Sequence, residues 1–211
     1  MAFHLEPDAF LLLEDASGKA RPIFKTCRTL VPKTVSDCHG RVFPVPDYTD
    51  PGDWRRQIDS ARATLLSDFD PIVLADSLDI TGTRDGGFDG MAIYDPFVRP
   101  SGWASAAGTF SAAQLLFSFN VNAGFDHFTE RPPFGDCFSP SPLEPPIDPT
   151  GWDADARQVA IAASRDRVLD SLRTTLALQI DPRLRDGASG FLAVYINSFN
   201  EWHEGPRSSR R

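Results

Sequence analysis

The stretch FLAVYINSFNEWHEG, residues 191–205, joins an apolar run to a dense polar and aromatic cluster. Residues 191–199 begin with continuous apolar side chains, the pattern of a strand covered on both faces in a parallel sheet. Folds built on parallel strands carry their sites at the carboxyl ends of those strands. The stretch therefore predicts an α/β fold with a site at this strand end. The polar and aromatic residues there are Asn200, Glu201, Trp202, His203 and Glu204.

Four earlier apolar or β-branched runs also predict strands. They cover residues 21–30, 71–76, 90–94 and 115–121. Gly/Asp/Pro-rich segments and helical patterns separate them, which indicates β/α units with parallel pairing. About five strands are too few for a closed eight-stranded barrel and are acceptable for an open sheet, so periodicity alone leaves the architecture open.

Two segments have helical periodicity. Residues 53–66 place apolar side chains at steps of three and four from Trp54 onward, with Asp50 or Asp53 able to cap. Residues 155–180 have the same period and end before Pro182, which cannot continue a helix. Residues 131–152 are rich in proline and have no period, and we interpret them as an active-site loop.

Composition excludes several classes of protein. The net charge of -8 disfavours nucleic acid as a partner, and no apolar run approaches the roughly 20 residues of a membrane span. No secretory signal is recognisable, which predicts a cytoplasmic location if the first residue is authentic. Cys27, Cys38 and Cys137 lack the spacing of a zinc site and are expected to be reduced thiols. We expect a single domain over residues 1–211, with no metal and no cofactor. The oligomeric state stays open.

Glu201 and Glu204 are candidates for a catalytic pair. Retaining cleavage of a glycosidic bond uses two carboxyl groups about 5 to 5.5 Å apart. Residues three apart on an ideal strand point to opposite faces, so the pair converges only if the strand ends or bulges within the motif. Trp202 could then supply a stacking face for a sugar. A solvated turn after the strand is an equal alternative on composition alone.

The motif SFNEWHEG, residues 198–205, resembles the signature of glycoside hydrolase family 99, the endo-α-mannosidases and endo-α-mannanases. GFDGMAIY at 87–94 and LLFSFNVNAGFD at 115–126 resemble the family's strands six and seven. RPIFKTCRT and DPIVLADS are more weakly similar to strands four and five. The resemblance covers about residues 20–205.

The resemblance implies a (β/α)8 TIM barrel of which this chain carries about strands four to eight, and so an incomplete barrel. An incomplete barrel would expose two parallel edges and an uncovered apolar lining. We therefore suspect a truncated product, a fragmentary gene model or half of a split enzyme. The implied activity is retaining, endo-acting hydrolysis of an α-linked mannose-containing glycan.

The family's roles carry over to matching positions only. By resemblance, Glu201 assists the substrate's 2-hydroxyl and Glu204 is the general acid/base. The residues expected to bind substrate are Tyr94 at the pocket floor, Asn200, Trp202 and His203 in its wall, and Arg131 after strand seven. Strand-end residues that would ring the mouth of the barrel are Asp76, Asp95, Asn122 and Asp126. Each of these four is more often a cap or turn residue.

Two alternatives remain. The first is a family-99-like protein of cell-surface polysaccharide biosynthesis, whose motif usually has a small residue in place of His203. The second is a non-catalytic glycan-binding remnant, favoured by the missing strands. His203 favours the hydrolase over the first alternative.

Overall fold

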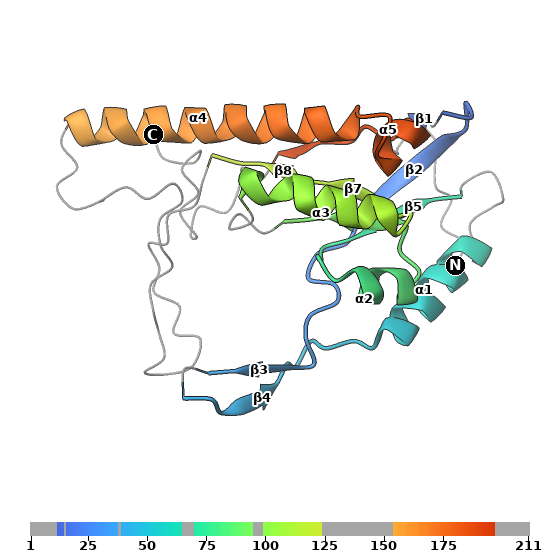
Figure 1. Cartoon of the computed structure of the whole chain (residues 1–211). Coiled ribbons are helices and arrows are strands. Elements are labelled where there is room, and N and C mark those ends of the chain that lie inside the picture. The colour runs from blue at the N-terminus through green and yellow to red at the C-terminus, as the bar shows by residue number, and fades with distance from the viewer. Residues whose placement is uncertain are drawn as a thin grey trace.

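The computed structural model describes residues 12–14, 16–37, 39–64, 70–94, 99–123 and 154–196, without the side chains of residues 156, 157 and 160. Helices surround a curled sheet (Figure 1). The helices are α1 (Pro51–Thr64), α2 (Ile80–Asp85), α3 (Pro100–Ala112), α4 (Ala154–Gln179) and α5 (Arg185–Ser189). The strands are β1 (Leu12–Glu14), β2 (Ala20–Lys25), β3 (Thr34–Ser36), β4 (Val42–Pro44), β5 (Ile72–Ala75), β6 (Gly90–Ala92), β7 (Leu116–Ser118), β8 (Asn120–Val121) and β9 (Tyr195–Ile196).

The main sheet has the order β1-β2-β5-β6-β7, and all its neighbours are parallel except the pair β1 and β2. β8 follows β7 after Phe119 and pairs in parallel with β9. β3 and β4 form a separate antiparallel hairpin. The predicted strands over residues 71–76 and 90–94 are confirmed as β5 and β6, whereas the run over residues 115–121 forms two short strands, β7 and β8, in different sheets. The mixed α/β class and parallel pairing are also confirmed.

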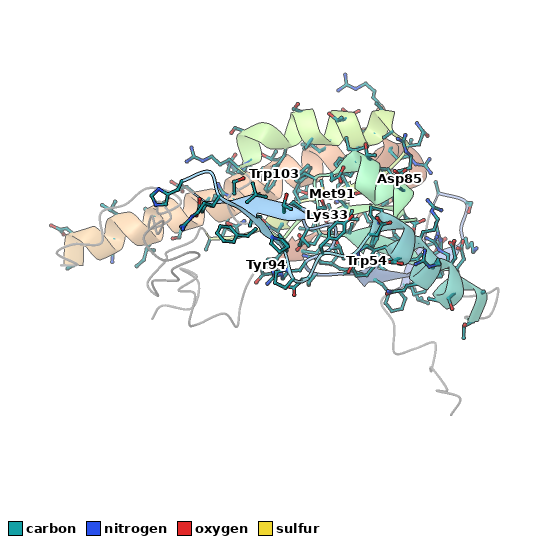
Figure 2. All side chains as sticks on the ribbon, turned by 90° about the horizontal axis from the view of Figure 1, so that it is seen from below. Lys33, Trp54, Asp85, Met91, Tyr94 and Trp103 are labelled. Atoms are coloured by element: carbon teal, nitrogen blue, oxygen red, sulfur yellow. The ribbon has the colours of Figure 1, made fainter. Side chains whose placement is uncertain are left out.

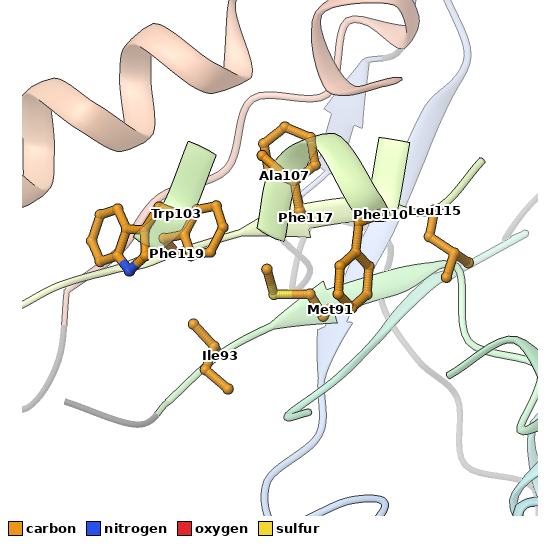
Figure 3. Packing of buried hydrophobic residues seen from close by; sticks show 8 residues of the cluster. All are labelled: Met91, Ile93, Trp103, Ala107, Phe110, Leu115, Phe117 and Phe119. Carbon is orange, nitrogen blue, oxygen red and sulfur yellow. The ribbon is translucent and has the colours of Figure 1, made fainter. Parts of the chain in front are cut away.

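Side chains alternate between the two faces of each strand, as the pleat requires. On β7, Leu116 faces one cluster and Phe117 faces another. The outward cluster packs under α3, where Trp103 stacks on Phe119 with 4.8 Å between ring centroids. Trp103 and Trp54 lie on the helices α3 and α1 (Figure 2), and Figure 3 shows the cluster under α3. The helices thus cover the convex face of the sheet.

The concave face of the sheet is filled from both ends. Its cluster contains Ile72, Leu74, Ala92, Leu116 and Phe191, with Leu13, Ile23, Ala193 and Tyr195 packed against it. Leu13 and Ile23 belong to β1 and β2, whereas Ala193 and Tyr195 belong to the segment that contains β9. The Ala16 amide, shortly after β1, donates to the Ser189 carbonyl at the end of α5 at 2.8 Å. Residues from both ends of the described chain therefore pack on the concave face.

The edge of β2 differs from the expected open parallel edge. β1 pairs with it in antiparallel fashion, with Leu12 opposite Pro22 and Glu14 opposite Ala20. Leu13 of β1 also covers part of the apolar lining. The expectation that both sheet edges and the lining lie uncovered is wrong at this edge.

The strands predicted over residues 21–30 and 191–199 differ from the structure, the first in its bounds and the second in its burial. The strand expected over residues 21–30 ends at Lys25, because Arg28 and Leu30 have positive φ angles of 49° and 57°, which no strand accommodates. The last strand is not covered on both faces in its described part. Leu192 and Ile196 are 47% and 84% exposed, while Phe191 is buried, so only one face is packed.

Helix α3 was not predicted from the sequence. Pro100 occupies its first turn, where a missing amide proton costs nothing. Trp103, Ala107 and Phe110 are its buried apolar residues, at helical spacing. The other positions of this helix are mostly serine, alanine and glycine, so the sequence does not show the alternation of apolar and charged residues that predicts an amphipathic helix.

Helices α1 and α4 are confirmed, but α4 does not bury the apolar positions that predicted it. Its buried side chains include Arg167, Ser171, Thr175 and Gln179, four residues apart along one stripe. The Gln179 side-chain amide donates to the carbonyls of Phe117 and Ala193 at 3.2 and 2.7 Å. The buried face of α4 is therefore polar, because its Gln179 side chain donates hydrogen bonds to backbone carbonyls. In the described part of the chain, no helix has the length and apolar character needed to cross a membrane.

A buried carboxylate on α5 is hydrogen-bonded to the backbone of β7. Asp186 on α5 accepts a hydrogen bond from the Phe117 amide at 3.1 Å, and its other oxygen has no partner. Burial raises the pKa of Asp186 to about 8, although the Phe117 amide and Arg185 oppose this. Asp186 is therefore largely protonated in the folded chain at neutral pH.

We expect Gly90→Ala to destabilise the fold, because a Cβ at Gly90 would collide with the backbone of Leu116 on the neighbouring strand. The free energy of unfolding should fall by about 1–3 kcal/mol, as for other overpacked sites. The matched control is Gly102→Ala in α3, where a Cβ meets nothing within 4 Å and should add about 0.5–1 kcal/mol. Urea unfolding measures both, and equal effects would contradict the β6–β7 packing.

Asp186 should make stability depend on pH. Between about pH 4 and 8 the folded chain keeps the Asp186 proton that the unfolded chain releases. The free energy of unfolding should therefore fall as the pH rises through this window and level off above it. Asp186→Asn, which can still accept from the Phe117 amide, should remove this slope of about one proton. Urea midpoints at several pH values test it, and identical slopes for both proteins would contradict the burial of this carboxyl.

Candidate functional site

Several polar and aromatic side chains lie at the carboxyl ends of the parallel strands. Lys25 ends β2, Asp76 follows β5, Tyr94 follows β6 (Figure 2), and Asn122 follows β8. Tyr195 lies on β9 beside Asn120, its partner in the ladder. Parallel strands bring their carboxyl ends to one edge of the sheet, so these residues share the end where α/β folds carry their sites.

Lys25 lies between two aromatic rings. Its ammonium nitrogen is 5.3 Å from the ring centroid of Tyr94 and 4.8 Å from that of Tyr195. Both distances are within the range of a cation–π attraction. Burial lowers the pKa of Lys25, while the negative charge of Asp76 partly offsets this. Burial also raises the pKa of the Tyr195 phenol.

Asp76 organises the backbone around this pair of rings. One carboxylate oxygen accepts from the Tyr94 amide at 2.8 Å, and the other accepts from the Arg28 amide at 3.2 Å. Its own amide donates to the Thr29 hydroxyl at 2.7 Å. These contacts favour the turn-forming role of Asp76 over direct substrate binding.

Two buried asparagines connect the end of β6 to the end of β8. The Asn120 side-chain amide donates to the Tyr94 carbonyl at 2.7 Å. The Asn122 side-chain amide donates in turn to the Asn120 side-chain oxygen. Tyr94 and Asn122, both predicted from the sequence, are thus linked through Asn120.

The other predicted site residues lie outside the described residues. They are Asp95, Asp126, Arg131, Asn200, Glu201, Trp202, His203 and Glu204, and the proposed loop over residues 131–152 lies there too. Their roles stay predictions. Lys25, Asn120 and Tyr195 were missed. The signal that could have found Lys25 is a lysine directly after the apolar pair Ile23 and Phe24 in a predicted strand.

Among the residues that the structure describes, no three His, Cys, Asp or Glu side chains lie close enough together to hold a metal ion. A cavity of about 1050 Å³ lies between α1 and the β2–β5 pair, with Phe24, Trp54, Ile58 and Val73 among its lining residues. Val73 packs with the cluster under α1, on the convex side of the sheet. This cavity is therefore separate from the strand-end site.

Comparisons with known proteins give one likeness in fold. No family model matches the chain, and no curated protein is significantly similar to it. The chain is similar to the structure of the GH99 endo-alpha-mannosidase from Bacteroides thetaiotaomicron, with a TM-score of 0.50 and 18% identity. That match covers 90% of this chain and 44% of the other. The same enzyme in complex with BIS-TRIS-propane matches with a TM-score of 0.45 and 18% identity, over 74% of this chain and 42% of the other.

At this identity the likeness shows a shared fold alone. The chain spans less than half the length of the enzyme it resembles. The curled sheet with helices on its convex face is consistent with part of a TIM barrel.

The lowered pKa of Lys25 is testable directly, because the sequence has three lysines, Lys19, Lys25 and Lys33. Reductive ¹³C-methylation gives each lysine one NMR signal that moves as it titrates. The Lys25 signal should titrate at a lower pH in the folded chain than in urea. Asp76→Asn removes the carboxylate that raises this pKa and should lower it further.

The matched control for that titration is Asp47→Asn, since Asp47 is exposed and pairs with Arg28. It should leave the Lys25 midpoint unchanged. A Lys25 signal that titrates at the same pH in the folded and unfolded chains would contradict its burial.

Proposed function

We propose that this chain is a glycoside hydrolase that cleaves α-mannosidic linkages inside a glycan, with Glu201 and Glu204 as its paired carboxyl groups. One observation carries the proposal: the motif SFNEWHEG continues directly from the last strand of a sheet whose fold is shared with an endo-alpha-mannosidase. The carboxyl end of that strand is where the fold class carries its chemistry.

The proposed reaction has two steps that retain the anomeric configuration. Glu201 accepts the proton of the 2-hydroxyl, whose oxygen attacks the anomeric carbon, while Glu204 gives its proton to the departing glycosidic oxygen. The product of this step is a 1,2-anhydro sugar. Glu204, now ionised, then accepts a proton from water, which opens that ring at the anomeric carbon while Glu201 returns the proton to the 2-oxygen.

The described strand ends would supply part of the substrate site. Tyr94 offers an aromatic face and Asn122 a side-chain amide, and the Asn120 bridge holds both in place. The remaining proposed contacts come from Asn200, Trp202, His203, Asp126 and Arg131. The substrate is an α-linked mannose-containing glycan, and no metal enters the proposed steps.

A glycan-binding protein without catalysis is the second candidate. It is favoured because the chain matches 44% of the endo-alpha-mannosidase, which is less than half of that enzyme. Binding of a mannan oligosaccharide without release of reducing ends would support it over the hydrolase.

The two glutamates should differ in how their loss depends on the leaving group. Glu204→Gln keeps the shape and removes the acid, so cleavage of natural glycans should slow by about 10²- to 10⁴-fold. Aryl mannosides with good leaving groups need little protonation and should lose much less. Glu201→Gln should slow both substrates alike, because the 2-hydroxyl oxygen displaces either leaving group from the anomeric carbon and needs Glu201 to accept its proton in both cases.

The measurement is kcat/KM on an α-mannan oligosaccharide and on an activated aryl mannoside. Glu6→Gln serves as a matched control, since Glu6 lies outside every motif. The assigned roles would be refuted if Glu204→Gln lost as much activity on the aryl mannoside as on the oligosaccharide, or if neither variant lost activity.

A further inference from the structure

Lys25 connects strands of two different sheets. It lies on β2, next to the β1 edge of the main sheet, while Tyr195 lies on β9, which pairs with β8 in a separate two-stranded sheet. Its ammonium nitrogen is nevertheless 4.8 Å from the Tyr195 ring centroid and 5.3 Å from that of Tyr94. Lys25 therefore joins the carboxyl end of β2 to β9, and the Ala16–Ser189 hydrogen bond joins the residues after β1 to α5.

The surroundings of Lys25 favour a fixed side chain. Burial lowers its pKa, and a desolvated ammonium is attracted more strongly to a ring face than an exposed one. Asp76 supplies compensating negative charge and also holds the backbone of Tyr94 through a 2.8 Å hydrogen bond. The cation, the two rings and the carboxylate form one unit, which we call the Lys25 clamp.

The clamp matters for the last strand because, in the described part of the chain, β9 pairs with β8 alone. Its ladder with β8 has two residue pairs, Asn120 with Tyr195 and Val121 with Ile196. Ile196 is 84% exposed, so Tyr195 is the residue through which β9 is held to the concave face. Glu201 follows Ile196 by five residues in the chain.

We propose that Lys25 is a positioning residue: by joining Tyr94 to Tyr195, it fixes the strand that leads into the Glu201–Glu204 motif relative to the rest of the site. This inference rests on the proposed function. Lys25 acts through the two tyrosines and takes no part in proton transfer. Removing its charge loosens β9 and misplaces the carboxyl groups.

The test compares Lys25→Met, which keeps an apolar stem without the charge, with Lys25→Arg, which keeps a cation able to lie on a ring. Lys33→Met is the matched control, since Lys33 lies 6.0 Å from the Tyr48 ring in a part of the chain outside the site. Thermal unfolding first establishes the temperature at which all variants are folded. Hydrolysis of an α-mannan oligosaccharide is then measured below it.

Lys25→Met should lower kcat by about 10- to 100-fold, the range expected when reacting groups are misplaced. Lys25→Arg should recover most of that loss, and Lys33→Met should keep the parent kcat. A Lys25→Met variant as active as the parent, or an equal loss in Lys25→Arg, overturns the inference and leaves the proposed function standing.

A second readout does not depend on activity. The ¹³C-methyl signal of Lys25 should lie upfield of its position in urea because two rings face it, and Tyr195→Leu should remove part of that shift. An unshifted signal overturns the inference. A parent chain that cleaves no α-mannoside refutes the proposed function, and with it the positioning role of Lys25 in catalysis, whereas the upfield signal still shows the clamp.

Discussion

The fold depends on one apolar cluster that both ends of the sheet share. Leu13 and Ile23 reach it from the first strands, and Phe191 reaches it from the segment before β9. Because side chains alternate along a strand, committing one set to this cluster turns the other set outward, where α1 and α3 cover it. A slip of one residue in any of these strands would reverse both faces at once, so the cluster also fixes the register.

The central strands were predictable because their sequences carry the pattern locally. Residues 71–76, 90–94 and 115–121 are apolar runs bounded by turn residues; the first two form β5 and β6, and the third forms β7 and β8. The pairing of β1 was not predictable, since three residues carry too little pattern and the tertiary contact of Leu13 decides it. The buried face of α4 was hidden because Gln179 satisfies the carbonyls of Phe117 and Ala193, a role that apolar periodicity does not detect.

Site residues could be predicted from the sequence only where the sequence also showed the end of a strand. Tyr94 and Asn122 follow apolar runs, and the structure joins them through Asn120. Lys25 and Tyr195 lay inside runs interpreted as strand interior, so neither was singled out. Only the early end of β2 and the curl of the sheet bring them together, and both features depend on contacts between distant parts of the chain.

The hydrogen bond between Ala16 and Ser189 joins residues 173 positions apart in the sequence. Closing so long a loop costs chain entropy that local contacts do not repay. The β1–β2 hairpin and the neighbouring β/α units can form early from short-range contacts, whereas this closure waits until the intervening sheet exists. Among the described residues, we therefore expect this contact between Ala16 and α5 to form later than the central strand pairs and to open more readily than they do in the native state.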